Sequence, residues 1–182
     1  MSNHAILVQD SVQAMNIDAY NRKAKGSADI DNGNVFYLAA KTGTAGEGEV
    51  WSATQPATGS GLLFSLHYIG TSYVSIADGS VGTQRATAYQ FEVVNNDTGM
   101  WMAYSPEIVT VVTASGKIYK GIDPDPRDFT NVSGEVFDAF KPQVGDLITM
   151  TADGITGSKT TGDYAVATNG QYALAWASAA NS

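Results

Sequence analysis

The chain contains no cysteine, and this absence removes several kinds of chemistry at once. Disulfides, thiolate zinc sites and cysteine nucleophiles all depend on that residue. Histidine is nearly as scarce, because His4 and His67 are the two that the sequence contains. No G-x-S-x-G turn accompanies them, and no recognisable turn positions a serine nucleophile. The sequence therefore predicts no catalytic residue and indicates a protein that is not an enzyme.

Charge is scarce as well. Charged residues make up 15% of the 182 residues, whereas about 25% is typical of soluble domains. The net charge of -8 argues against binding through the phosphates of a nucleic acid. No apolar run approaches the roughly 18 residues of a membrane-spanning helix, and the first residues lack the features of a signal peptide. We therefore expect neither a nucleic acid nor a membrane as the partner.

What the sequence does contain is a β pattern, in which short apolar or alternating segments are separated by glycine and asparagine turns. Tyr89, Phe91 and Val93 alternate with polar residues, which is the period of a strand with one wet face. Asn169-Gly170 predicts a hairpin between the last two segments. Strands are expected at 35–38, 49–51, 62–69, 72–77, 88–95, 99–104, 107–114, 117–120, 146–151, 163–168 and 171–176. The sequence thus predicts an all-β fold, a sandwich or barrel of about ten short strands.

One segment interrupts this rhythm. Residues 121–142 contain Pro124, Pro126 and Pro142, and proline removes a hydrogen-bond donor that a strand would need. The pattern predicts a long proline-containing loop at this point. Residues 133–140 are also compatible with one short helix, with Ser133 near its N-cap.

The first residues differ from the rest in charge and pattern. Residues 1–25 carry a net charge of +1, so the remainder carries -9. We expect an extended N-terminal arm over residues 1–28 and an all-β domain over residues 29–182. A basic segment on an acidic body is typical of an arm that docks on a partner. The predicted partner-binding residues are Arg22, Lys23 and Lys25.

Two acidic segments were candidates for cation binding. Asp29-x-Asp31-x-Gly33 has the start of a calcium loop but lacks its third carboxylate, so a hairpin turn is favoured. A denser cluster lies in the proline-containing segment and consists of Asp123, Asp125 and Asp128. A solvated acidic loop, or one that meets a basic partner, is favoured there over a calcium site. The sequence predicts no metal site and no cofactor.

Four short segments carry a resemblance to a known family. They are residues 100–107 (MWMAYSPE), 120–124 (KGIDP), 127–131 (RDFTN) and 137–146 (FDAFKPQVGD). The sequence of about residues 95–150, in which these segments lie, resembles the head decoration or accessory capsid (cement) proteins of tailed bacteriophages.

The resemblance implies a structural virion protein that stabilises a capsid by protein–protein contacts. It implies an all-β body, an extended terminal arm and self-association, often as trimers. The partner would be the major capsid protein, and the location the capsid surface of a virion assembled in the host cytoplasm. A protein that binds only the assembled shell adds to its stability by mass action.

Two alternatives remain open from the sequence. One is another virion subunit of similar composition, such as a coat, tail-tube or tail-fibre protein. The other is a carbohydrate-binding β module, which would use exposed aromatic rings such as those of Trp51, Trp101 and Trp176. Aromatic residues in all-β domains more often belong to the core, and this interpretation is favoured for the three tryptophans.

Overall fold

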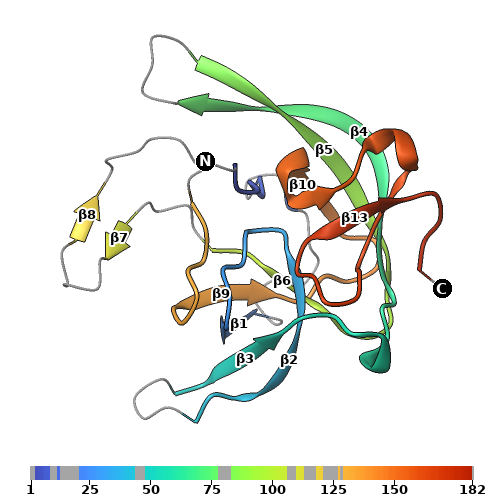
Figure 1. Ribbon diagram of the computed structural model, residues 1–182. Coiled ribbons are helices and arrows are strands. Elements are labelled where there is room, and N and C mark those ends of the chain that lie inside the picture. The colour runs from blue at the N-terminus through green and yellow to red at the C-terminus, as the bar shows by residue number, and fades with distance from the viewer. Residues whose placement is uncertain are drawn as a thin grey trace.

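The computed structural model describes residues 3–8, 12, 21–43, 48–77, 83–105, 110–112, 118–120, 127 and 129–181. Within these residues the regular structure consists of strands and short 3-10 turns. The predicted all-β class is therefore confirmed, with a small closed barrel packed beside a six-stranded sheet (Figure 1). The described residues contain no helix that is long and apolar enough to cross a membrane.

Five strands close the barrel in the order β1-β3-β2-β6-β9. Their bounds are Asn21–Lys25 for β1, Val35–Lys41 for β2, Val50–Thr54 for β3, Trp101–Ala103 for β6 and Val136–Phe140 for β9. A tight turn leads into β2, because the Asn34 amide donates to the Asp31 carbonyl oxygen at 3.1 Å. Gly33 lies in this turn at a φ of 87°, where a side chain would be strained. A turn at this point is thus confirmed, but the hairpin expected there is wrong, because β1 pairs with β3 and β9 and not with β2.

The second sheet has the order β10-β5-β4-β12-β13-β11. Its strands are Phe64–Ala77 (β4), Thr83–Asn96 (β5), Leu147–Thr151 (β10), Ile155–Thr156 (β11), Tyr164–Val166 (β12) and Leu174–Ala177 (β13). The hairpin predicted across Asn169-Gly170 is confirmed, since β12 and β13 pair antiparallel. Two further strands, Thr110–Val112 (β7) and Ile118–Lys120 (β8), pair with each other. Short 3-10 turns lie at Thr58–Ser60 (η2), Ala152–Gly154 (η4) and Lys159–Thr161 (η5).

The main core fills the space between the barrel and the six-stranded sheet. It includes the fully buried side chains of Phe64, Phe91, Met102 and Phe140. A second cluster, with Phe36 at its centre, fills the barrel. The alternation predicted for Tyr89 to Val93 is confirmed, because Phe91 and the residues two positions away on either side face this core.

The helix considered for residues 133–140 is wrong, because β9 occupies Val136–Phe140 and pairs with β1 and β6. The actual period is two: Phe137 and Ala139 are buried, while Val136 is 44% exposed. Pairing with strands from distant parts of the chain thus decided the local conformation.

Two predicted strands are joined in the structure. Residues 62–69 and 72–77 were expected to be separate because Gly70 lies between them. Instead, β4 runs without a break for 14 residues and pairs with β5 along its whole length. The register shifts between Tyr68 and Gly70, so an irregularity absorbs the glycine without ending the strand.

Part of the segment expected as an N-terminal arm belongs to the barrel wall. β1 pairs parallel with β3 on one side and antiparallel with β9 on the other. Ala24 is fully buried in the barrel core. Residues 21–25 are therefore held along both edges of their backbone.

Candidate functional site

Residues 6–8 lie along the outer edge of β10 and cover it at residues 149–151. The Thr151 amide donates to the Ile6 carbonyl oxygen, and the Val8 amide donates to the Thr149 carbonyl oxygen, each at 2.8 Å. Leu7 forms a bridge with Met150 between these two bonds, and its side chain is 1% exposed. The N-terminal segment thus pairs like one more short strand, and this edge of the six-stranded sheet is closed.

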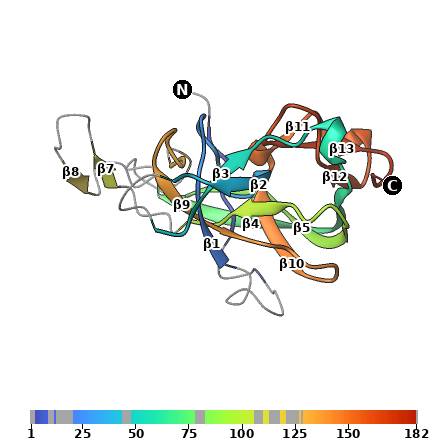
Figure 2. The ribbon, with the colours of Figure 1, turned by 90° about the horizontal axis from the view of Figure 1, so that it is seen from below.

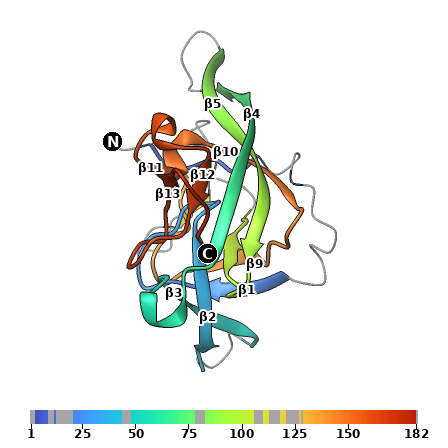
Figure 3. The same cartoon turned by 90° about the vertical axis from the view of Figure 1, so that its right-hand side faces the viewer.

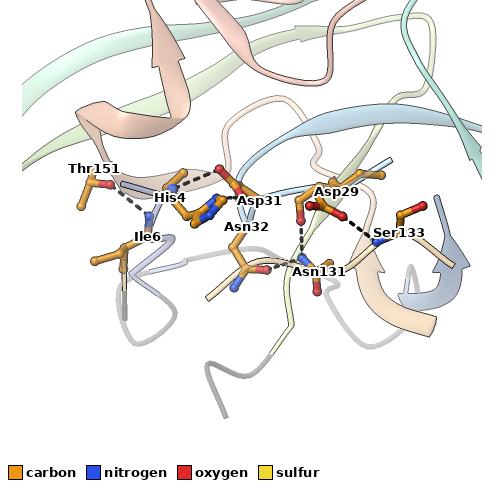
Figure 4. A network of polar contacts seen from close by, with 10 residues as sticks. His4, Ile6, Asp29, Asp31, Asn32, Asn131, Ser133 and Thr151 are labelled. Atoms are coloured by element: carbon orange, nitrogen blue, oxygen red, sulfur yellow. Dashed lines mark hydrogen bonds and ion pairs between the residues drawn. The ribbon is translucent and has the colours of Figure 1, made fainter. Parts of the chain in front are cut away.

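A polar network fastens this segment to the barrel (Figure 4). His4 Nδ1 lies 2.8 Å from Asp31 Oδ1, and the second carboxylate oxygen accepts the Ala5 amide at 3.2 Å. Asp29 Oδ1 accepts the Ser133 amide at 2.8 Å. Both carboxylates of the Asp-x-Asp-x-Gly segment therefore hold protein donors. Their observed role is to fix the turn and the strands around it.

Two buried asparagines form the centre of the network. The Asn32 side chain accepts the Ser105 amide and donates to the Ser105 carbonyl oxygen, each at 2.9 Å. Asn131 donates to the Ile30 carbonyl oxygen at 2.7 Å and to Asn32 Oδ1 at 3.3 Å. Together with the contacts of His4, Ala5 and Ser133, these bonds join four separate segments of chain. Because the central groups are buried, the network makes a rigid support.

The predicted partner-binding residues Arg22, Lys23 and Lys25 all lie on β1. Lys23 forms an ion pair with Asp138, directly opposite on β9. The Arg22 guanidinium lies 5.7 Å from the ring centroid of Trp101 and donates to the carbonyl oxygen of its own neighbour. The structure thus places the three basic residues on one barrel strand, where Arg22 and Lys23 are exposed and each has a contact within the barrel. Their role in partner binding stays a prediction.

The most prominent surface feature is the hairpin of β4 and β5. Each strand has 14 residues, and the hairpin projects past the body in both Figure 1 and Figure 3. On the β5 side, the last pair with β10 is Thr151 with Ala88. On the β4 side, the last pair with β12 is Tyr164 with His67. Beyond these points the hairpin has two strands alone. We call residues 73–77 and 83–87 the ribbon.

One face of the ribbon continues the face that packs on the core. Tyr89 lies on the core side of β5, and Thr87, two residues earlier, lies on the same side. Tyr73 stands directly opposite Thr87 in the register. Tyr89 is packed against the core, whereas Tyr73 is 63% exposed. The ribbon therefore carries an aromatic side chain on the core-type face to a place where most of it is exposed.

Aromatic rings mark the point where the body ends and the ribbon begins. Tyr68, Tyr89 and Trp176 form edge-on pairs with centroids 5.2 to 6.5 Å apart. The Lys159 ammonium covers this group, 4.2 Å from the Tyr68 centroid and 5.4 Å from that of Trp176. Because Trp176 is 7% exposed, it acts as a core residue. The interpretation of this tryptophan as core is confirmed, and it offers no open platform for a sugar.

Two exposed ion pairs perturb the pKa values of carboxylates. Lys159 donates to Asp163 at 2.6 Å, and this hydrogen bond, with the lysine charge, lowers the pKa of Asp163. Lys41 donates to Glu49 at 2.5 Å and lowers the pKa of Glu49 in the same way. Both carboxylates lie in water, so these pairs are local restraints and not proton-transfer groups.

The remaining candidates can be placed only in part. His67 is half-buried on β4, with its ring centroid 5.0 Å from that of Tyr164. Three or more metal-ligating side chains do not come together anywhere among the described residues. Asp123, Asp125 and Asp128 lie outside those residues, so the acidic-loop interpretation stays a prediction. Comparison of the chain with protein-family models, curated proteins and solved structures found no match.

Sequence reasoning missed the ribbon, although its signal was present. The β4 segment FSLHYIGTSYVSIA contains β-branched and aromatic residues on both sides of Gly70. Read as one strand, it would have been too long to be covered by neighbours of ordinary length, which have about five or six residues. Strand length, compared with that of the other strands, was therefore the usable signal for a projection.

Proposed function

We propose that this protein is a structural protein of a tailed-phage virion, which decorates and stabilises the capsid and contacts the major capsid protein through the ribbon. The observation that carries this proposal is the two-stranded projection on a rigid body. A pair of strands alone is only marginally stable in water, and a third strand or a packing surface stabilises it. A contact with a partner would supply that support. The phage assignment comes from the sequence resemblance and does not depend on the ribbon.

The side chains of the ribbon fit a protein partner. Tyr73 presents an exposed aromatic ring, and Arg85 is exposed two positions from Thr87 on the same side of β5. Tyrosine and arginine are enriched where interfaces concentrate their binding energy. The partner surface that suits them has an apolar pocket beside a carboxylate.

A ribbon of this size makes a small contact. Five residue pairs extend about 17 Å, at about 3.4 Å per residue. Such a contact is smaller than the roughly 800 Å² per partner of a standard interface. Repetition over a capsid lattice compensates, because linked copies bind with a high effective concentration. Decoration of a repeating shell is a setting in which weak contacts of this kind suffice.

The test is binding to undecorated capsids of the phage that encodes the chain, identified from the neighbouring genes. Tyr73→Ala should weaken binding by about 30-fold or more, which corresponds to about 2 kcal/mol at a residue that dominates an interface. Val144→Ala is the matched control, because Val144 is also 63% exposed but lies on the turn before β10. The control should bind like the unmodified protein.

Two results would overturn the proposal. One is full-affinity binding by the Tyr73→Ala protein, which would exclude the ribbon as the contact. The other is a complete lack of capsid binding by the unmodified protein. Removal of residues 1–25 is a poor alternative test, because it would delete β1 and open the barrel. Charge reversal at Arg22, Lys23 and Lys25 tests the predicted basic contact without deleting a strand.

A further inference from the structure

The outer edge of β4 is the long uncovered edge of the described sheets. β12 pairs with β4 only at residues 65–67, and the Tyr68 amide donates to the Asp163 carbonyl oxygen just beyond. From Gly70 to Ala77 no described strand lies on that side of β4. Figures 1 and 3 show this part of the hairpin projecting beyond the other strands of its sheet. Alternate backbone amides and carbonyls along this edge therefore lack a strand partner.

The other edges are closed or short. The five-stranded sheet closes on itself and has no edge. The β10 edge is covered by residues 6–8. At the opposite end of that sheet, β11 has two residues. This leaves the hairpin, whose second uncovered edge, residues 83–87 of β5, carries the charge of Arg85.

Residues 70–77 lack the charged residues and prolines that often protect an exposed edge. Their sequence, GTSYVSIA, contains no lysine, no other charged residue and no proline. Natural proteins place such residues on edges to prevent pairing with other chains. An unprotected edge of this length in an acidic protein is well suited to receive a strand.

We propose that the β4 edge within residues 70–77 pairs antiparallel with the same edge of a second copy of the chain, about a two-fold axis that passes beside one of these residues. The two ribbons would merge into one sheet with the order β5-β4-β4-β5. This inference rests on the proposed function in one respect, since it names how copies associate before they bind a lattice. We assign a second copy as the partner of this edge because the edge is complementary to itself. A two-fold axis would bring identical uncharged residues together, so no like charges would face each other.

The geometry also separates the acidic bodies. In antiparallel pairing, each body lies at the far end of the other copy's ribbon. The ribbon extends about 17 Å, which exceeds the screening length of about 8 Å at physiological salt. The net charge of -8 on each chain therefore opposes this arrangement weakly. The same charge would disfavour a dimer in which the two bodies pack directly on each other.

The first experiment measures association of the purified full chain by sedimentation velocity over a range of concentrations. The unmodified protein should dimerise. Val74→Lys should weaken the dimer by about tenfold or more, since two lysines would then face each other near the axis. Ala86→Lys is the matched control, because Ala86 stands directly opposite Val74 but on β5. The Ala86→Lys substitution should change the dissociation constant of the dimer by less than about twofold.

The second experiment uses the absence of cysteine from the chain. Single cysteines at each position from 71 to 76 are oxidised in turn and examined on a non-reducing gel. Only the residue at the two-fold axis stands opposite itself, because its neighbours are displaced by about 7 Å. We expect one position to give a covalent dimer in high yield. Ala86→Cys should stay largely monomeric.

Three results would overturn the inference: a monomer at every concentration, equal weakening by both lysine variants, or equal cross-linking at β4 and β5 positions. Capsid binding is measured separately, so the two proposals can fail independently. A monomer that binds capsids through Tyr73 would refute the edge pairing alone. A dimer with no capsid affinity would refute the proposed function alone.

Discussion

Two buried asparagines, two residues apart, should respond oppositely to the same substitution. Asn32 is 0% exposed, and its amide group satisfies both the N–H and the C=O of Ser105. Asn34 is 7% exposed, but its Oδ1 has no hydrogen-bond partner. Asn32→Ala removes a satisfied network, whereas Asn34→Ala removes an unsatisfied acceptor.

The structure sets the size of the difference. Asn32→Ala removes the side-chain partner of two buried backbone groups of Ser105, and the loss of such a partner costs about 1–3 kcal/mol for each group. Water that enters the space would restore part of this, so we expect a loss of about 3 kcal/mol in the free energy of unfolding. Asn34→Ala should change it by less than about 1 kcal/mol, because relief of the unpaired oxygen offsets the lost packing.

Equilibrium unfolding in urea measures both variants. With a slope of about 2 kcal/mol per molar, Asn32→Ala should lower the midpoint by about 1.5 M with little change in slope. Asn34→Ala should stay within about 0.5 M of the unmodified protein. Equal destabilisation by the two substitutions would refute the hydrogen-bond argument, as would a neutral Asn32→Ala. Either result would mean that side-chain volume and not polar pairing holds this region.

Two further predictions concern the 3-10 turns of the body. Gly162→Ala should lower the melting temperature by about 6 °C or more, because the new Cβ would lie 2.0 Å from a backbone oxygen. Gly59→Ala, with nothing within 4 Å, should melt like the unmodified protein, and equal melting of both variants would contradict this reasoning. Lys159→Ala should raise the pKa of Asp163 toward its ordinary value, as an NMR titration would show. Since the pKa of Asp163 is lowered in the folded state, the ion pair contributes to the free energy of unfolding at neutral pH, and this contribution is lost as the pH falls through that pKa. An unchanged titration of Asp163 in the Lys159→Ala protein would refute the role of Lys159.

The fold class could be predicted because it depends on local patterns. The alternation around Phe91 and the Asn169-Gly170 turn each specify strands from a few neighbouring residues. The barrel wall could not be predicted at β1, whose segment NRKAK has little apolar pattern. That strand forms because β3 and β9, distant in sequence, supply hydrogen-bond partners along both of its edges.

The ribbon was harder to predict than the fold class, because it exists only where the neighbouring strands end before the β4–β5 hairpin does. The sequence shows the residues of β4, but only the sheet order shows that β12 and β10 end before the hairpin does. The support network has the same limitation. Asn32 and Asn131 are 99 residues apart, and no spacing rule joins them. The sequence indicated the basic residues of β1 as a free arm for the same reason, because their partners were not visible. In the structure β1 is part of the barrel wall, between β3 and β9 (Figure 2).

The most direct test of the central claim is an electron cryomicroscopy map of capsids saturated with the purified protein. The account predicts bound density on the outside of the shell, with the hairpin of β4 and β5 against the major capsid protein and Tyr73 within the contact. Bound density in which this hairpin points into solvent, with another surface of the body on the shell, would contradict it.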